Sequence, residues 1–257
     1  MDYVAEKDFI IKELHKAAVL FCETPTPERV ATKSAYNVVT DIDTGVEAKL
    51  IKAIKFVFPN DTIVSEEKYP RVKLGERTWV IDPIDGTSNM AHGSPLYGLQ
   101  AAFCVNGEPV VAAMHLPALG LKLHAVKGEG AYLNNKLIER KPFEPSLSTV
   151  SFGDFSHKSV KVAKAQARAM RKVYPLLGKL RMFGAACVDF AFAAMGKTDG
   201  AVLLAKKPWD VLPGALLCQE AGLRVTNLDG EPYKAGDFGI LALRPEVYDT
   251  VKQYMVL

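Results

Sequence analysis

The sequence predicts a layered α/β (α+β) sandwich, and three features of its hydrophobic pattern lead to that prediction. Between residues 3 and 22, apolar residues recur every three or four positions, which is typical of an amphipathic helix. Residues 96–126 alternate between apolar runs and turn residues, which indicates an antiparallel meander. From residue 149 onward, strand-like runs alternate with helical patterns, which favours an α/β arrangement.

Length and composition set the scale of the fold. The chain has 257 residues, of which 49% are apolar, so it can bury one large core or two closely packed ones. Residues 139–148 contain two prolines and charges of both signs, and they are the predicted seam. We therefore expect an α+β half with an antiparallel sheet at residues 1–140 and an α/β half at residues 141–257.

Charge and cysteine usage exclude several classes of protein. The net charge of +3 is too small to require a nucleic-acid partner. The four cysteines lie far apart and form no C-x-x-C pair, which indicates buried thiols rather than a disulfide framework or a zinc site. Charges at Glu6, Lys7 and Asp8 do not fit a signal peptide, and no apolar run approaches the ~20 residues of a membrane helix. We expect a cytoplasmic protein that binds neither nucleic acid nor membrane.

Local patterns place the elements that precede the central motif. They are a helix over residues 3–22, a proline-containing break at 24–28, a strand at 37–40, a helix from Asp43 or Thr44 to about Phe58, and a strand at 62–64. This last strand delivers Glu66 and Glu67 to the edge of a sheet.

The elements after the motif are predicted from turn residues and periodicity. They are a hairpin at Asn106-Gly107, a second hairpin at 127–130, a strand at 149–152, a helix at 158–174, a helix that ends at Met195, a strand at 201–205, a helix at 211–221 and a final helix from Pro245. The helix at 158–174 carries a basic stripe from Lys161 to Arg171, which is typical of a solvated face but could also capture a second anionic group.

The central motif is the stretch Arg77–Met90. Its apolar run, residues 79–81, predicts a buried strand that stops at Asp82, and Asp85 follows three residues later. Two carboxylates at the end of a buried strand are costly unless they are solvated or neutralised by a cation. One interpretation is an ordinary polar turn built on the intervening proline and the following glycine. The other is a magnesium site, because these carboxylates and the carbonyl of Ile84 are oxygen ligands.

Other residues also have a structural and a functional interpretation. The N–H groups of Gly86, Thr87 and Ser88 lie at the predicted start of a helix, where a phosphate can bind. Taken alone, Asp43 and Asp210 each have the position of a helix N-cap. Glu66 with its neighbour Glu67 could equally be a charged loop.

Three motifs in combination resemble one known family. DPIDGT at residues 82–87, VSEE at 64–67 and Trp209-Asp210 are similar, in order and spacing, to the motifs of the inositol monophosphatase family of lithium-sensitive, magnesium-dependent phosphatases. The resemblance covers nearly the whole chain. It implies a layered αβαβα sandwich, hydrolysis of a small phosphate monoester, sensitivity to lithium and a homodimer.

The resemblance also implies roles for individual residues. The implied ligands of about two or three Mg²⁺ ions are Glu66, Asp82, the Ile84 carbonyl, Asp85 and Asp210. Asp43 and Thr87 would orient the attacking water, with Glu66 near it, and the N–H groups of Gly86 and Thr87 would hold the phosphate.

The substrate side departs from the family pattern. Inositol-specific members carry an acidic residue seven positions before the aspartate of the Trp-Asp motif, and this chain has Leu203 there. After Gly184, where those enzymes have a hydroxyl side chain, it has Ala185. Both changes remove hydrogen-bond partners of a polyol ring, so discrimination among polyol and sugar phosphates should be poor. Lys206 and Lys207 could favour a more anionic substrate.

Several functions therefore remain open. The leading one is hydrolysis of a phosphate ester of the inositol-1-phosphate class. Alternatives are fructose-1,6-bisphosphatase, histidinol-phosphatase and 3′-phosphoadenosine 5′-phosphate phosphatase activity. A different class is a phosphometabolite sensor without catalysis, but such a protein should have lost at least one metal carboxylate. A nucleic-acid binder is disfavoured because the basic stripe lacks interleaved aromatic residues.

Overall fold

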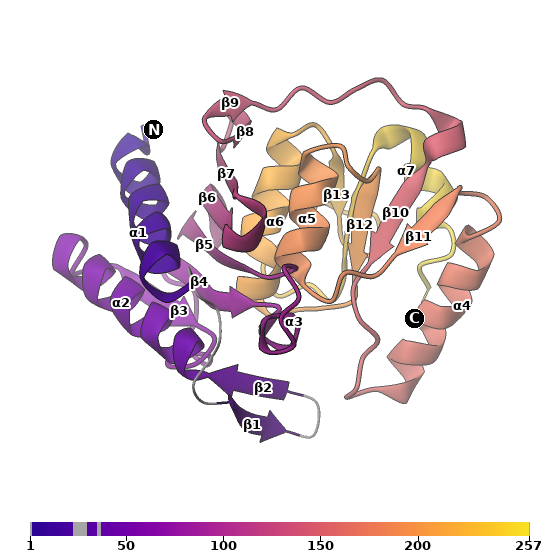
Figure 1. Cartoon of the computed structure of the whole chain (residues 1–257). Coiled ribbons are helices and arrows are strands. Elements are labelled where there is room, and N and C mark those ends of the chain that lie inside the picture. Colours follow the sequence, from indigo (N-terminus) through magenta and orange to yellow (C-terminus); the bar gives the residue numbers. More distant parts are fainter. Residues whose placement is uncertain (1, 23–29, 35–36, 257) are drawn as a thin grey trace.

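The computed structural model of the chain describes residues 2–22, 30–34 and 37–256, so the predicted break at 24–28 lies outside the described residues. Figure 1 shows five layers that follow one another across the molecule: two helices, a sheet, two helices, a second sheet and two helices. This is the predicted αβαβα sandwich.

The first layer consists of helices α1 (Val4–Cys22) and α2 (Asp41–Val57), which cover one face of a seven-stranded sheet. The sheet has the order β3-β4-β5-β6-β7-β8-β9. Its strands are β3 (Thr62–Ser65), β4 (Arg77–Asp85), β5 (Gly98–Val105), β6 (Glu108–Leu116), β7 (Leu121–Val126), β8 (Gly130–Leu133) and β9 (Lys136–Leu137). All neighbours are antiparallel except β3 and β4, which are parallel. The meander and both predicted hairpins are confirmed.

The central layer is formed by α5 (Ala186–Ala194) and α6 (Pro208–Glu220), which contact both sheets. The second sheet has the order β11-β10-β12-β14-β13. Its strands are β10 (Thr149–Phe152), β11 (Lys179–Arg181), β12 (Gly200–Leu203), β13 (Arg224–Thr226) and β14 (Ile240–Leu243). The last layer is α4 (Val160–Val173) with α7 (Pro245–Lys252).

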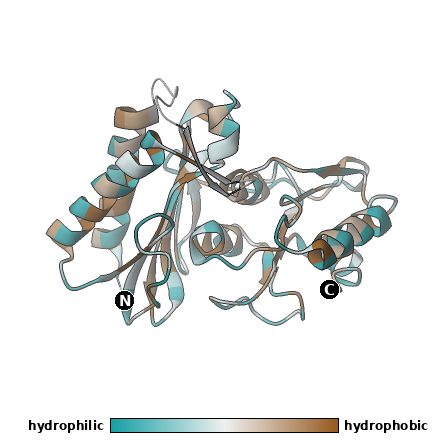
Figure 2. Ribbon diagram, turned by 90° about the horizontal axis from the view of Figure 1, so that it is seen from below, coloured by the Kyte–Doolittle hydropathy of each residue, from teal (hydrophilic) through white to brown (hydrophobic). Residues whose placement is uncertain are grey.

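Side-chain chemistry explains this layering. The helices at the two ends of the sandwich carry both hydrophilic and hydrophobic residues, as Figure 2 shows, because only one face of each is buried. In α4, Ala165, Ala169 and Val173 are buried, whereas the basic stripe Lys161–Arg171 is exposed. In contrast, α5 and α6 are apolar on nearly all sides because they lie between two sheets.

The structure corrects three predicted boundaries. Helix α2 begins at Asp41 and is capped by Thr40, so Asp43 is the third helical residue rather than the cap. Helix α6 begins at Pro208, which makes Asp210 its third residue rather than its cap. Strand β4 does not stop at Asp82 but continues to Asp85, because this end still pairs with β5 across a register shift.

Two short strands have no clear signal in the sequence. They are β1 (Val30–Ser34), which pairs with β2 (Asn37–Thr40), and β11 at the edge of the second sheet. Residues 139–148 connect the two sheets, but the division into an α+β half and an α/β half stays a prediction. Across the described residues, none of the helices combines the length and apolar character needed to cross a membrane.

Candidate active site

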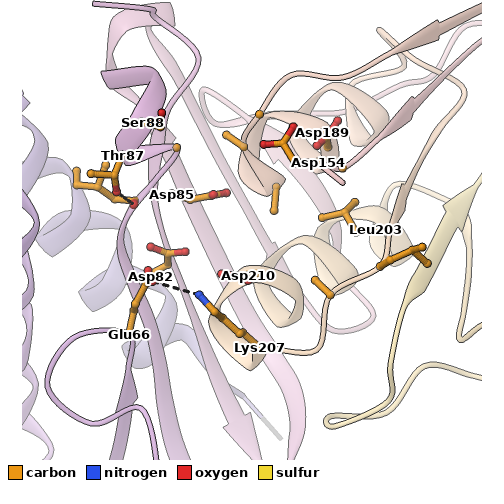
Figure 3. A pocket seen from close by; sticks show the side chains of 18 residues that line it. Glu66, Asp82, Asp85, Thr87, Ser88, Asp154, Asp189, Leu203, Lys207 and Asp210 are labelled. Atoms are coloured by element: carbon orange, nitrogen blue, oxygen red, sulfur yellow. Dashed lines mark hydrogen bonds and ion pairs between the residues drawn. The ribbon is translucent and has the colours of Figure 1, made fainter. Parts of the chain in front are cut away.

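A cavity of about 290 Å³ lies where the two sheets and the central helices meet. The parallel strands β3 and β4 point their carboxyl ends toward it, and so do β10 and β12. The residues that line it are Glu66, Asp82, Ile84, Asp85, Gly86, Thr87, Ser88, Gly153, Asp154, Gly184, Ala185, Ala186, Asp189, Leu203, Leu204, Ala205, Lys207 and Asp210. Figure 3 shows how the side chains from these separate segments face one another.

Three carboxylates meet at one side of this cavity. Glu66, Asp82 and Asp210 each contribute one oxygen, and these oxygens lie within 4.8 Å of one another. The parallel pairing of Ser65 with Ile81 accounts for the first contact, since it brings the next residues of β3 and β4 side by side. Helix α6 supplies Asp210 from more than a hundred residues further along the chain. The sequence motifs therefore converge in space.

The carboxylates of this cluster could hold a cation. Asp82 is 1% exposed, and its Oδ1 has no hydrogen-bond partner among the described residues. Burial, followed by the charges of Glu66 and Asp85, raises the pKa of Asp82 well above its ordinary value. Burial also raises the pKa of Asp210 to about 7, against the opposing effect of Lys207. An all-oxygen donor set of crowded carboxylates fits a hard divalent cation such as Mg²⁺.

Asp85 connects the first sheet to helix α5 of the central layer. Its Oδ2 accepts a hydrogen bond from the backbone N–H of Cys187 in the first turn of α5. Gln100 Nε2 lies 3.4 Å from the same oxygen. Burial raises the pKa of Asp85 to about 6, although the bonds from Cys187 oppose the shift. Asp85 also lines the cavity.

Asp43 lies behind the cavity and holds Thr87 in place. Thr40 donates to Asp43 Oδ2 through its backbone N–H at 2.9 Å and also through its hydroxyl, while Asp43 N–H donates back to that hydroxyl. The two residues thus form the capping box that starts α2. Thr87 Oγ1 lies 2.8 Å from Asp43 Oδ1 and 3.0 Å from the Ile84 carbonyl oxygen. A buried helix cap therefore fixes the orientation of a hydroxyl that lines the cavity.

Gly86 makes the turn between β4 and the short helix α3 (Thr87–Ala91). Its φ is +87°, in the left-handed region that favours glycine. A Cβ at this position would come within 2.8 Å of the Leu96 carbonyl oxygen and 2.9 Å of the Ala185 side chain. The turn leaves the N–H groups at the start of α3 without acceptors in the helix. Because α3 has only five residues, the individual N–H groups rather than a helix dipole are available for a ligand.

Glu66 is positioned by groups on two sides. The buried carboxylate of Glu47 on α2 accepts hydrogen bonds from the N–H groups of Glu67 at 2.9 Å and Lys68 at 3.1 Å, which fixes the loop after β3. Lys207 Nζ lies 3.2 Å from Glu66 Oε1 (Figure 3). Burial opposes the charged form of Lys207, but Asp210 and Glu66 together outweigh burial and raise its pKa.

The structure brings most of the predicted substrate-side residues to the cavity. Gly184, Ala185 and Lys207 line it, and so does Leu203. Lys206 is exposed and is not among the lining residues. None of the residues of the basic stripe Lys161–Arg171 lines the cavity either.

Two acidic residues in the lining were not predicted. Asp154 follows β10 by two residues, and Asp189 is the one charged residue of the otherwise apolar helix α5. Both had a signal in the sequence. A carboxylate just past a strand end is the same pattern that identified Asp82, and an acid inside an apolar helix needs a reason to be there.

Comparison with known proteins shows to which family the chain belongs. The sequence profile of the inositol monophosphatase family matches residues 6–253. The chain belongs to the inositol monophosphatase family. The family resemblance stated from the three motifs is thus confirmed over nearly the whole sequence.

Relatives within the inositol monophosphatase family carry two kinds of name. A fructose-1,6-bisphosphatase/inositol-1-monophosphatase of Thermotoga maritima is 31% identical over 250 residues, which are 95% of this chain and 93% of that protein. The Nus factor SuhB of Escherichia coli is 30% identical over 209 residues, or 81% of this chain and 78% of that protein. A solved Thermotoga maritima IMPase matches with a TM-score of 0.87 at 28% identity, covering 98% of this chain and 97% of that one. Family and relatives indicate a phosphatase.

Proposed function

We propose that this chain hydrolyses a small phosphate monoester of the inositol-1-phosphate class with the help of Mg²⁺. The observation that carries the proposal is the convergence of Glu66, Asp82 and Asp210, with one oxygen each inside 4.8 Å. Buried carboxylates in such numbers are costly unless a cation joins them. Membership of the inositol monophosphatase family supports the same reading.

The proposed metal ligands divide between two elements and one loop. Glu66 after β3, Asp82 and Asp85 on β4, and Asp210 on α6 offer carboxylate oxygens, and the Ile84 carbonyl offers a further one. When bound there, divalent ions would lower the pKa of a water molecule and stabilise the charge that develops on the leaving oxygen.

The proposed role of Thr87 is to orient the attacking water. Its hydroxyl proton faces Asp43 Oδ1 at 2.8 Å, which leaves an oxygen lone pair on Thr87 to accept a hydrogen bond from water. Asp43 is 1% exposed and is held by Thr40, so the hydroxyl cannot rotate freely. A water fixed in this way is positioned for in-line attack, and Glu66 lies on the same side of the cavity.

The proposed phosphate site is the turn at Gly86. The N–H groups of Gly86 and Thr87 would donate to phosphate oxygens, which requires the backbone to approach the ligand closely. The positive φ of Gly86 and its contact with Ala185 explain why a side chain is absent there.

The cavity lining bears on the choice among the alternative substrates. A second phosphate would need cations at the far side of the cavity, but Lys207 is the one basic residue among the described lining residues and it lies against Glu66. This favours a substrate with a single phosphate group over fructose-1,6-bisphosphate or 3′-phosphoadenosine 5′-phosphate. Lithium inhibition and a homodimer are further proposals that rest on family membership.

The test is phosphate release from inositol-1-phosphate, fructose-1,6-bisphosphate, histidinol phosphate and 3′-phosphoadenosine 5′-phosphate at equal concentration with Mg²⁺. We expect turnover of at least one monoester and a loss of about a thousandfold or more in Asp85→Asn, because removing a metal ligand removes charge stabilisation. Asparagine keeps an acceptor for the Cys187 N–H, so the fold should survive. Asp229→Asn, in an exposed turn, is the matched control.

Two results would count against the proposal. One is near-wild-type, magnesium-dependent activity of Asp85→Asn. The other is binding of these esters by the wild type without phosphate release, which would instead favour the non-catalytic sensor.

A further inference from the structure

Two carboxylates face the cavity outside the cluster of Glu66, Asp82 and Asp210. Figure 3 shows Asp154 and Asp189 close together on the side opposite Thr87 and Ser88. Asp189 projects from α5 and is 0% exposed. Asp154 follows the carboxyl end of β10. They lie across the cavity from Thr87, which belongs to the proposed phosphate site.

Asp189 lacks the partners that a structural carboxylate normally has. Neither of its oxygens has a hydrogen-bond partner of ordinary geometry among the described residues. The Ser151 hydroxyl is nearby and lowers the pKa of Asp189 somewhat, but it is directed at the Gly200 carbonyl at 3.4 Å. Burial is the larger effect and raises this pKa well above its ordinary value, with further contributions from Asp85 and Asp154. A buried carboxyl group without hydrogen-bond partners lowers the stability of the fold unless a ligand supplies those partners.

The contrast with Asp43 shows how unusual this is. Asp43 is as deeply buried, yet both of its oxygens accept hydrogen bonds, from Thr40 and Thr87. The fold can therefore satisfy a buried carboxylate where its role is to hold other groups. Asp189 also lines the cavity, but neither of its buried oxygens has a hydrogen-bond partner of ordinary geometry among the described residues.

The overall charge of the cavity favours a cationic ligand group. Six carboxylates and one ammonium group line it, and the ammonium of Lys207 lies against Glu66. Two divalent cations and a phosphate dianion would together neutralise only part of that excess negative charge. A neutral hydroxyl group could donate a hydrogen bond to Asp189 but would not compensate the negative charge of the cavity. An ammonium group donates hydrogen bonds and also carries a compensating positive charge.

We propose that Asp154 and Asp189 form a subsite for the ammonium group of the leaving alcohol, so that the substrate is the phosphate ester of an amino alcohol. This deepens the proposed function and rests on it. Leu203, on the same side of the cavity in Figure 3, and Leu204, which also lines it, give the carbon chain of such an alcohol an apolar surface. Asp189 then acts in binding and specificity, and it takes no part in the chemical step.

The experiment uses paired ligands that differ in one group. They are ω-aminoalkyl and ω-hydroxyalkyl phosphates with two to five carbons, together with the corresponding phosphonates, which cannot be hydrolysed. For the wild type with Mg²⁺, we expect one chain length at which kcat/KM for the amine exceeds that for the matched alcohol by at least tenfold. Calorimetric titration of the phosphonates should show the same preference in Kd.

Variants separate a binding role from a structural one. Asp189→Asn should reduce the amine-to-alcohol ratio to about one for both kcat/KM and Kd, and its Tm should be equal to or above that of the wild type because an unpartnered buried acid is removed. Asp154→Asn should also reduce the amine-to-alcohol ratio. This variant tests the subsite if Asp189→Asn does not fold. Asp229→Asn is the control for the loss of one negative charge.

The outcomes distinguish this inference from the function on which it rests. Phosphate release from alcohols and amines at equal rates, with equal phosphonate Kd values, overturns the subsite and leaves the phosphatase intact. A wild-type preference that persists in both variants also overturns it, as does a lower Tm of Asp189→Asn with an unchanged ratio. Failure to release phosphate from any ester overturns the phosphatase instead.

Discussion

Two buried aspartates near the cavity differ in their hydrogen bonds and therefore in their expected roles. Asp43 and Asp82 are each 1% exposed. Asp43 accepts hydrogen bonds from Thr40, which caps α2, and from Thr87, which lines the cavity. It therefore links the start of α2 to the cavity wall. Oδ1 of Asp82 has no hydrogen-bond partner among the described residues, which fits the proposed role of Asp82 as a metal ligand. The difference lies in the neighbours and cannot be seen in the residue type.

The hydroxyl of Thr87 can be tested by a matched pair of substitutions. Thr87→Ser keeps the oxygen that faces Asp43 at 2.8 Å, and we expect it to retain activity within about fivefold of the wild type. Thr87→Val has nearly the same shape but no hydroxyl, and we expect kcat to fall by about a hundredfold or more because the water loses its orientation. Steady-state kinetics with Mg²⁺ measures both. Equal activities of the two variants would show that the hydroxyl has no role in turnover.

At the residue scale, the sequence motifs identified the acidic residues that cluster in the structure more fully than the other residues that line the cavity. Glu66, Asp82 and Asp210 could be found because each ends or starts an element in a recognisable motif. Asp189 could not be placed, because its significance depends on α5 being buried between two sheets with no partner for the carboxylate. Lys206 is exposed and does not line the cavity, so its role at the substrate stays a prediction.

At the scale of elements, the errors in the predicted boundaries have a common cause. The local pattern of β4 ends at Asp82, but pairing with β5 holds the strand in place as far as Asp85. In the same way, Asp43 has the composition of a cap, yet Thr40 provides the cap and Asp43 completes the capping box. Propensity finds that an element exists, whereas tertiary pairing and reciprocal hydrogen bonds set its ends.

The crossing of α5 and α6 should be especially sensitive to added volume. A Cβ on Gly214 of α6 would overlap the ring of Phe190 on α5, and Phe190 is 0% exposed. We expect Gly214→Ala to lower the free energy of unfolding by about 1–3 kcal/mol, despite the higher helix propensity of alanine. Gln219→Ala, at an exposed position of the same helix, should have little effect. Denaturant unfolding measures both, and an equally stable Gly214→Ala would mean that the two helices can separate at small cost.

At the scale of the whole molecule, the central helical layer makes the site possible. Helix α6 carries Asp210 to the strand ends of the first sheet, and α5 binds Asp85 through its N-terminal backbone. Both helices are buried on two sides, so their positions are fixed by packing against both sheets. A cluster assembled from such distant parts of the chain should form only when the entire sandwich has folded.

This assembly predicts how stability depends on pH. The folded pKa of Asp210 is about 7 and that of Asp85 about 6, both above their unfolded values. Protonation therefore favours the folded metal-free state, and this stabilisation is lost as pH rises through 6–7. We expect the Tm of the metal-free protein to fall from about pH 4, near the unfolded pKa, to about pH 7 and to level off above it, whereas the increase in Tm caused by Mg²⁺ should grow as pH rises through the folded pKa values of about 6 and about 7.

Asp210→Asn serves as the reference for that profile. It should flatten the decline of Tm with pH, because it removes a carboxyl group whose pKa rises to about 7 in the folded state. Differential scanning calorimetry without metal, with and without the substitution, provides the comparison. Identical pH profiles for the two proteins would show that Asp210 does not titrate in this window.

The most direct test of the metal centre is calorimetric titration of the metal-free protein with Mn²⁺ or Mg²⁺, compared with Asp82→Asn. Asparagine removes the charge of the most buried carboxylate of the cluster but keeps its shape. We predict saturable binding by the wild type, and for the folded Asp82→Asn variant an affinity at least tenfold weaker. Equal affinities for the two proteins, or no binding by the wild type, would contradict the assignment of these carboxylates as a shared site for divalent ions.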